Sequence, residues 1–175
     1  MARGDRLQFI VLTEGKRDYD FARGYLEQRF GKRRAEVRPV STVMAGSGSG
    51  EQQVRERFAD ELRALRAYGG ENRFLVVMTD GDRLSPAQRR AQLEAQESRR
   101  DEDRVAIIVP CRNLESWFAW LDRVFEDESA DYKPRYRNDK PTSRGRAMAS
   151  ACGDVDIQSM PRSLQEACGE LQRIT

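Results

Sequence analysis

The chain has 175 residues, of which 38% are apolar and 34% are charged, and its formal net charge is +2. This length suits one domain, or one domain with an appendage, that has a heavily charged surface. A net charge this small is no argument for nucleic-acid binding. Because the chain contains no histidine, catalytic triads and zinc sites that depend on an imidazole are excluded.

The cysteines and the apolar segments indicate the cellular compartment in which the protein is expected. Cys111, Cys152 and Cys168 show no Cys-x-x-Cys spacing, which is typical of a reduced protein with incidental thiols. No apolar segment approaches the ~18 residues of a membrane span, and the N-terminus lacks the long apolar core of a signal peptide. We therefore expect a cytoplasmic protein without a membrane partner.

The first half of the chain alternates between predicted strands and helices. Residues 7–13 (LQFIVLT) predict a buried strand, and a helix begins within the following Glu14-Gly-Lys-Arg-Asp18. Residues 36–40 predict a short second strand, and the glycine-rich stretch 44–50 predicts a mobile loop. Residues 51–68 carry apolar side chains at helical spacing and predict a helix that covers the sheet.

The central strand is predicted at residues 74–78 (FLVVM), an unbroken apolar run that suits burial on both faces. If the strand continues through Asp80-Gly81-Asp82, both carboxylates point the same way and can face one ion. The same residue types are common in turns, so a plain turn is the alternative.

The second half continues this pattern. Ser85-Pro86 predicts the start of a polar helix that runs to about residue 100 and faces either solvent or a second subunit of a homo-oligomer. Residues 104–110 predict a fourth strand, followed by a helix at 111–121. The alternation predicts an α/β fold for residues 1–125, with a Rossmann-like sheet of about four mainly parallel strands between helices. Residues 126–175 are predicted to pack on the same domain as a basic irregular segment and a short closing helix.

Residues 131–146 form a basic segment, with six basic and two acidic residues. Its prolines and glycine predict irregular structure. Tyr132 and Tyr136 lie between the cations, a pattern that suits phosphates and unstacked bases, although a solvated charged loop fits equally well. The predicted nucleic-acid contacts are Lys133, Arg135, Arg137, Lys140 and Arg144.

Acidic residues follow three of the predicted strands. Ligands of open α/β sheets gather outside the carboxyl ends of the strands, where Glu14, Asp80 and Asp82 are expected. Glu115 lies in the first turn of the next helix, a place that the helix dipole alone would favour. In the absence of histidine, a site made of carboxylates is the obvious metal chemistry of this chain, and it suits one or two Mg²⁺ or Mn²⁺ ions.

Two of these motifs resemble the Toprim domain, the metal-binding fold of topoisomerases, primases, recombination-repair proteins and OLD-family nucleases. They are Glu14-Gly15-Lys16 after one strand and Asp80-Gly81-Asp82 after another. The later Pro110-Cys-Arg-Asn-Leu-Glu115-Ser-Trp is similar to a stretch of small stand-alone Toprim-like proteins related to the OLD nucleases. Many of those proteins are linked to bacterial anti-phage or toxin systems. The resemblance covers about residues 7–121.

The resemblance implies a metal-dependent nuclease that cleaves DNA or RNA, with an ATPase as partner protein. By analogy, Glu14, Asp80 and Asp82 bind Mg²⁺ or Mn²⁺, and Glu115 completes a second site. Lys16 and Lys140 are the predicted catalytic cations, which would offset charge in the transition state. A non-catalytic module that binds nucleic acid or a partner protein is the main alternative, and nucleotidyl transfer is a third.

Overall fold

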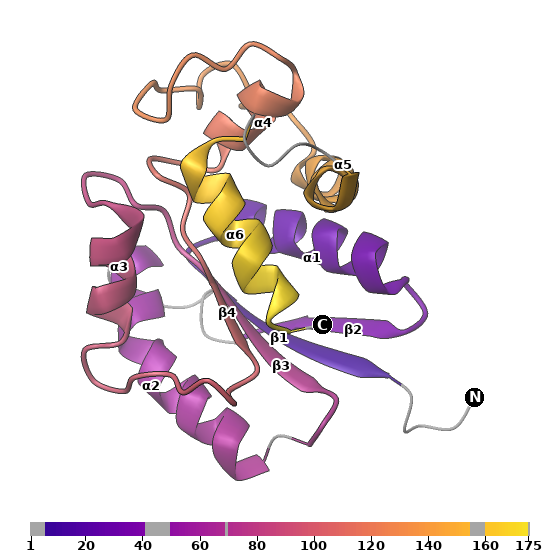
Figure 1. Ribbon diagram of the computed structural model, residues 1–175, viewed down its shortest axis with the longest axis vertical. Coiled ribbons are helices and arrows are strands. Elements are labelled where there is room, and N and C mark those ends of the chain that lie inside the picture. Colours follow the sequence, from indigo (N-terminus) through magenta and orange to yellow (C-terminus); the bar gives the residue numbers. More distant parts are fainter. Residues whose placement is uncertain (1–5, 41–49, 69, 155–159, 175) are drawn as a thin grey trace.

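Four parallel strands form one sheet in the order β2-β1-β3-β4 (Figure 1). The computed structural model describes residues 6–40, 50–68, 70–154 and 160–174. The predicted fold class is confirmed: the sheet is all parallel, helices flank it, and a helical extension follows it. The strands are β1 (Leu7–Thr13), β2 (Ala35–Pro39), β3 (Arg73–Met78) and β4 (Val105–Ile108). The helices are α1 (Lys16–Phe30), α2 (Gly50–Tyr68), α3 (Pro86–Leu93), α4 (Glu115–Leu121), α5 (Pro141–Asp154) and α6 (Arg162–Gln172).

The central strand β3 is buried on both faces, as its apolar sequence predicts. Phe74, Val76 and Met78 pack in the core beneath α1, α4, α5 and α6. Leu75 and Val77 point to the other face and join the core beneath α2 and α3. Successive strand residues alternate between faces, so a strand covered by helices on both sides needs an uninterrupted apolar run. Figure 1 shows α2 and α3 on the side of the sheet away from α1 and α6.

Helix α5 corrects the prediction that residues 131–146 are irregular throughout. The segment forms turns up to Asp139, and α5 begins at Pro141, where a proline fits because the first helical N–H needs no partner. The helix crosses α1 with its backbone in direct contact. A Cβ atom on Gly24 would lie 2.1 Å from the Thr142 carbonyl oxygen, and one on Gly145 would lie 2.1 Å from that of Phe21. Pairing with α1 through these glycines therefore outweighs the local helix-breaking composition.

The two tyrosines of the basic segment belong to the core. Tyr132 and Tyr136 are 8% and 2% exposed, and the Tyr136 ring packs edge-on against Phe118. Its hydroxyl donates a hydrogen bond to Asp122. Neither ring is presented to solvent, so the prediction that these tyrosines stack on bases is wrong for this conformation.

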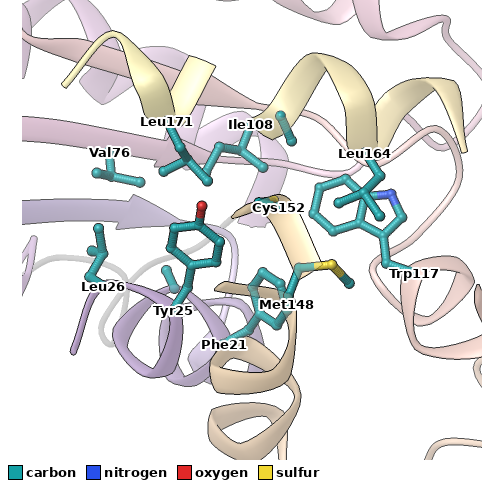
Figure 2. Close-up of a pocket in the computed structure, with 12 residues that line it drawn as sticks. Phe21, Tyr25, Leu26, Val76, Ile108, Trp117, Met148, Cys152, Leu164 and Leu171 are labelled. Atoms are coloured by element: carbon teal, nitrogen blue, oxygen red, sulfur yellow. The ribbon is translucent and has the colours of Figure 1, made fainter. Parts of the chain in front are cut away.

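Apolar side chains fill the layer between α1, α5, α6 and the sheet (Figure 2). The cavity that remains among Phe21, Tyr25, Met148 and their neighbours measures about 10 Å³, near the least space that one water needs. Cys152 of α5 and Cys168 of α6 form a disulfide beside this layer. The interpretation of all three cysteines as incidental thiols is therefore wrong for this pair. Sequence spacing could not reveal the bridge, because it joins two helices that meet only in the folded chain.

One predicted helix is shorter than expected, and one predicted loop lies almost entirely outside the described residues. Helix α3 ends at Leu93 rather than near residue 100, since residues 94–104 offer no apolar side chain larger than alanine to bury. The predicted mobile loop at 44–50 falls, apart from Gly50, outside the described residues. Among the helices of the described ranges, none is both long and apolar enough to cross a membrane.

Candidate active site

The strand order marks the carboxyl ends of β1 and β3 as the expected ligand site. The chain runs from β1 outward to β2 and then returns to the other side of β1 as β3. Ligands of open α/β sheets bind at such a switch point, outside the carboxyl ends of the strands. Thr13 and Met78, the last residues of β1 and β3, are partners in the sheet register. The residues that follow them, Glu14 and Asp80, therefore leave the sheet side by side.

Glu14 is joined directly to the end of β3. Its Oε1 atom accepts a hydrogen bond of 2.8 Å from the backbone N–H of Asp80 and another from the Thr79 hydroxyl. The two motifs that resemble Toprim sequences thus meet in space. These two hydrogen bonds fix the Glu14 carboxylate beside the Asp80 backbone.

The Asp80-Gly81-Asp82 segment is a tight turn and does not continue β3. The strand ends at Met78, and Asp82 has a φ of 55°, so the two carboxylates are not held by the alternation of one strand. The Gly81 and Asp82 N–H groups donate to the carbonyls of Pro110 and Arg112. A Cβ atom on Gly81 would lie 2.1 Å from the Cys111 carbonyl oxygen. This contact requires glycine. The helix predicted from residue 111 begins only at Glu115, and the Arg112 carbonyl accepts from the Asp82 N–H of the turn.

Arg89 of α3 binds the backbone of the same turn. Its side chain is 7% exposed, and its guanidinium donates to the carbonyl oxygens of Asp80 (3.0 Å) and Gly81 (3.3 Å). It also pairs with Glu51 of α2 at 2.6 Å and approaches Asp82 at 3.6 Å. A planar fork with five donors suits this arrangement. Sequence reasoning missed Arg89, because nothing in the pattern of α3 separates it from the neighbouring arginine.

Asp18, in the first turn of α1, is a further acid of the site that sequence reasoning missed. Burial, followed by the charges of Glu14 and Glu115, raises its pKa to about 7 against the lowering effect of Lys133 and Arg17. Asp80 behaves alike: burial raises its pKa well above the ordinary value, and Asp18 and Glu14 add to the shift. These mutual effects require that the acids lie close together. The signal in the sequence was the spacing of four residues from Glu14.

Lys133 is the cation beside these acids. Its Nζ atom lies 3.6 Å from Oδ2 of Asp80. Burial lowers the pKa of Lys133, but the charges of Asp80, Glu115 and Asp82 outweigh this effect and raise it. The side chain nevertheless remains 55% exposed. Lys133 is therefore held as an ammonium group that faces both the acids and solvent.

Glu115 lies at the far side of the same cluster and is already paired. Its side chain is 8% exposed and accepts a bond of 3.1 Å from Arg17. Arg17 also donates to the carbonyl oxygens of Tyr136 and Arg137. It thereby ties the turns that carry Lys133 to α1 and α4.

The other predicted cations lie elsewhere. Lys16 extends into solvent and pairs with Asp20. Lys140 is exposed at the start of α5, where its carbonyl accepts from Ser143 and Arg144. Within the described part of the chain, neither lysine pairs with an acid of the site. Of the predicted nucleic-acid contacts, Arg144 is engaged with Asp122 and Asp139, while Arg135 and Arg137 are exposed.

The donor set suits a hard divalent cation. Within the described ranges, no three acidic or thiol side chains are already grouped around one point. The oxygens of Glu14, Asp18, Asp80 and Asp82 are nevertheless the ligand type that Mg²⁺ and Mn²⁺ prefer. The pKa values of Asp18 and Asp80 are raised chiefly by burial, and the charge of Glu14 adds to both shifts. A bound cation would favour the ionised forms of these acids.

Comparisons with protein families, with curated proteins and with solved structures find no match to this chain.

The raised pKa of Asp18 predicts how the stability of the cation-free protein depends on pH. Between pH 3.8 and about 7 the folded state binds a proton that the unfolded state has released. The free energy of unfolding therefore falls as pH rises through this range. Above this pH range Asp18 is ionised, so a divalent cation can bind without displacing a proton from it. Mn²⁺ should therefore raise the melting temperature more at pH 8 than at pH 5.5. Thermal unfolding with and without Mn²⁺ measures both effects.

Asp18→Asn is the control for this pH dependence. The variant should show a smaller decline in stability between pH 4 and 7, because its amide does not titrate, while Asp80, whose pKa is also raised, causes the decline that remains. An unchanged decline in Asp18→Asn would show that another group causes it.

Proposed function

We propose that the protein is a metal-dependent nuclease of the Toprim type, related to the OLD-family nucleases, that cleaves phosphodiester bonds of DNA or RNA. The observation that carries the proposal is the hydrogen bond between Glu14 and the backbone of Asp80. It brings acids from two strand exits together at the switch point of the sheet, with Asp18 and Lys133 beside them.

The residues at this end of the sheet would have different roles in such a site. Glu14, Asp18, Asp80 and Asp82 would hold one or two Mg²⁺ or Mn²⁺ ions, with Glu115 at the border of the cluster. A bound divalent cation supplies an activated water and neutralises charge on the phosphate. Lys133, which faces solvent from beside Asp80, is placed to contact a phosphate oxygen. It takes the role that the sequence suggested for Lys140, because Lys140 lies at the start of α5.

The biological setting follows from the resemblance alone. Small stand-alone relatives of the OLD nucleases suggest an effector of an anti-phage or toxin system that works with an ATPase partner. Nucleic acid would be its substrate.

One observation favours a non-catalytic module as the second candidate. Lys133 pairs with Asp80, and Arg17 pairs with Glu115, so part of the acidic charge is neutralised without a metal ion. A module of this kind would keep these ion pairs permanently and bind nucleic acid or a partner protein through the same edge.

Incubation of the purified chain with labelled DNA and RNA separates the two candidates. The nuclease should cut at least one substrate in Mn²⁺ or Mg²⁺ and none in excess EDTA. Binding of Mn²⁺ is measured in parallel by calorimetry, because an effector can stay silent until its partner releases it. Absence of both cleavage and Mn²⁺ binding would refute the nuclease and leave the module.

A further inference from the structure

The small net charge of the chain hides a strong local excess of positive charge. Residues 29–34 (RFGKRR), at the end of α1 and in the turn that leads to β2, contain four basic residues and no acidic one. All four are exposed. One further arginine precedes β1 and another begins β3, at the same end of the sheet. These six residues are called the amino-end surface: Arg6, Arg29, Lys32, Arg33, Arg34 and Arg73.

The parallel sheet brings these cations together from separate parts of the chain. The N–H of Leu7 donates to the Arg34 carbonyl, which places Arg6 beside Arg34. Arg73 is the register partner of Gln8, on the other side of β1. Figure 1 shows the turn between α1 and β2 beside the start of β1. The cations therefore gather where the strands begin, at the opposite end of the sheet from the acid cluster.

The six cations of the amino-end surface have no counter-charge in the described part of the chain. No described acid forms an ion pair with any of them. The acids that flank residues 29–34 in the sequence are engaged with other arginines: Glu27 pairs with Arg23 and Arg146. Glu36 pairs with Arg38. Like charges that are held together without a counter-charge repel one another, so this surface favours an anion from outside the chain.

The charge of the molecule is thus unevenly distributed along the strand direction. The amino-end surface carries more positive charge than the chain as a whole, whose net charge is +2, so the remainder of the chain is net negative. The acid cluster lies beyond the carboxyl ends of β1 and β3. β1 has seven residues, and at about 3.3 Å per residue its two ends lie roughly 23 Å apart. A polyanion is therefore attracted to the amino-end surface even when the acids at the other end repel phosphate.

An exposed aromatic ring near this surface favours nucleic acid over an acidic protein as the polyanion. Tyr68 ends α2 and is 80% exposed, and no other large apolar side chain among the described residues is exposed. The Arg73 N–H donates to the Gly70 carbonyl, so the chain turns from Tyr68 directly into the start of β3. A ring beside cations suits an unstacked base next to its phosphates. Glu71 is exposed on this side, so the phosphate contacts are expected nearer β1 and β2.

We propose that the amino-end surface binds the phosphate backbone of a single nucleic-acid strand, with Tyr68 stacking on one of its bases. The choice of nucleic acid as the partner also rests on the proposed function. Contacts with phosphates carry no sequence information, so this binding is independent of sequence. At about 3.4 Å per stacked nucleotide, a strand that reaches from this surface to the acid cluster has roughly seven nucleotides or more. The surface would hold a long substrate while its scissile phosphate enters the acid cluster.

The test removes three charges from this surface and compares the result with an equal change elsewhere. The surface variant carries Arg6→Gln, Arg33→Gln and Arg34→Gln. The control variant neutralises three exposed arginines that pair with acids: it carries Arg55→Gln, Arg63→Gln and Arg162→Gln. Fluorescence anisotropy measures the binding of a labelled single-stranded 20-mer over a series of salt concentrations. The buffer contains EDTA, so that neither cleavage nor a metal ion contributes.

The surface variant should bind the 20-mer about 10- to 100-fold more weakly than the wild type. The slope of log K against log salt should become shallower by about 2, because each lost contact with a phosphate of a single strand removes about 0.7. The control variant should change the dissociation constant by less than about threefold and keep the slope. The melting temperature of the surface variant should not fall, since the change removes repulsion between unpaired cations.

Tyr68→Ala should weaken binding of the 20-mer about tenfold, a typical loss when one base–aromatic stack is removed, and leave the salt slope unchanged. Tyr68→Phe keeps the ring and should bind as the wild type does. Full affinity in Tyr68→Ala would overturn the stacking role of this side chain.

Two results would overturn the proposal for the surface itself. An equal loss of affinity in both triple variants would mean that only the net charge matters. Tighter binding of poly-glutamate than of the 20-mer at the same salt concentration would assign the surface to an acidic protein.

The outcomes also separate this proposal from the nuclease. Mn²⁺-dependent cleavage by the wild type, combined with unchanged binding by the surface variant, would remove the amino-end surface as a nucleic-acid site and leave the nuclease. Binding in EDTA that depends on this surface, in a wild-type chain that neither cuts nor binds Mn²⁺, would support the surface and refute the nuclease.

Discussion

Replacement of Asp80 by asparagine is expected to reduce Mn²⁺-dependent cleavage to less than about 1% of the wild-type rate, the size of loss typical when one electrostatic contribution to a transition state is removed. The fold should persist. Asparagine has nearly the same shape as aspartate, and the backbone N–H of residue 80, which binds Glu14, is unaffected by the change.

The same variant should be more stable than the wild type at pH 8 without divalent cations. Burial, followed by Asp18 and Glu14, raises the pKa of Asp80. Its ionised form is therefore disfavoured in the folded state relative to the unfolded chain, and stability is lost as pH rises through the folded pKa. Asparagine removes that penalty. Urea denaturation at pH 8 in EDTA measures the gain, which should shrink as pH falls and vanish below pH 3.8, where the aspartate is protonated in both states.

Asp101→Asn is the matched control, since this aspartate is fully exposed and the chemical change is identical. It should leave both cleavage and stability unchanged. Wild-type cleavage by Asp80→Asn would refute the proposed role of the acid cluster. A loss of stability at pH 8 would instead show that Lys133 compensates the charge of Asp80 fully.

The sequence was sufficient to predict the sheet and the meeting of its acids. Both depend on patterns that short segments carry by themselves: an apolar run for a strand covered on two faces, and polar residues at the strand exits. Parallel strands then bring Glu14 and Asp80 to one edge without further information, because their carboxyl ends share that edge.

The shape of the site needed information that no short segment carries. The turn at Asp82 depends on carbonyl groups of residues 110 and 112, about 30 positions later in the chain. Likewise, Lys133 rather than Lys140 reaches the acids because Arg17 fixes the intervening turns through the carbonyls of Tyr136 and Arg137. Contacts of this kind are visible only after the chain has folded.

The role of Asp18 could be predicted from the sequence only in part. Its position one helical turn beyond Glu14 was readable from the sequence, but an acid in the first turn of a helix is also what the helix dipole favours. The structure distinguishes the two, since a dipole-favoured surface acid would not have its pKa raised to about 7 by burial and by neighbouring carboxylates.

The substitution Arg89→Met is expected to destabilise the protein by about 3–5 kcal/mol, the usual cost of removing one partner from a buried ion pair. The loss would leave the carbonyls of Asp80 and Gly81 without their donor and Glu51 without its counter-charge. Urea denaturation measures the change. Arg90→Met is the control on the same helix, where a half-buried arginine pairs with Glu166, and it should cost about 1 kcal/mol or less.

Arg89 should also govern the affinity for the cation, because it positions the turn that carries Asp80 and Asp82. Under conditions where Arg89→Met is folded, Mn²⁺ should bind roughly 10- to 100-fold more weakly, as is typical when a group that orients metal ligands is removed. Glu51→Gln in the Arg89→Met background should recover part of the stability, since it neutralises the stranded carboxylate, but none of the Mn²⁺ affinity, since the turn stays unsupported. Recovery of both together would mean that Arg89 acts on the site only through overall stability, and an unchanged Mn²⁺ affinity in Arg89→Met would mean that Gly81 and its contact with Cys111 hold the turn unaided.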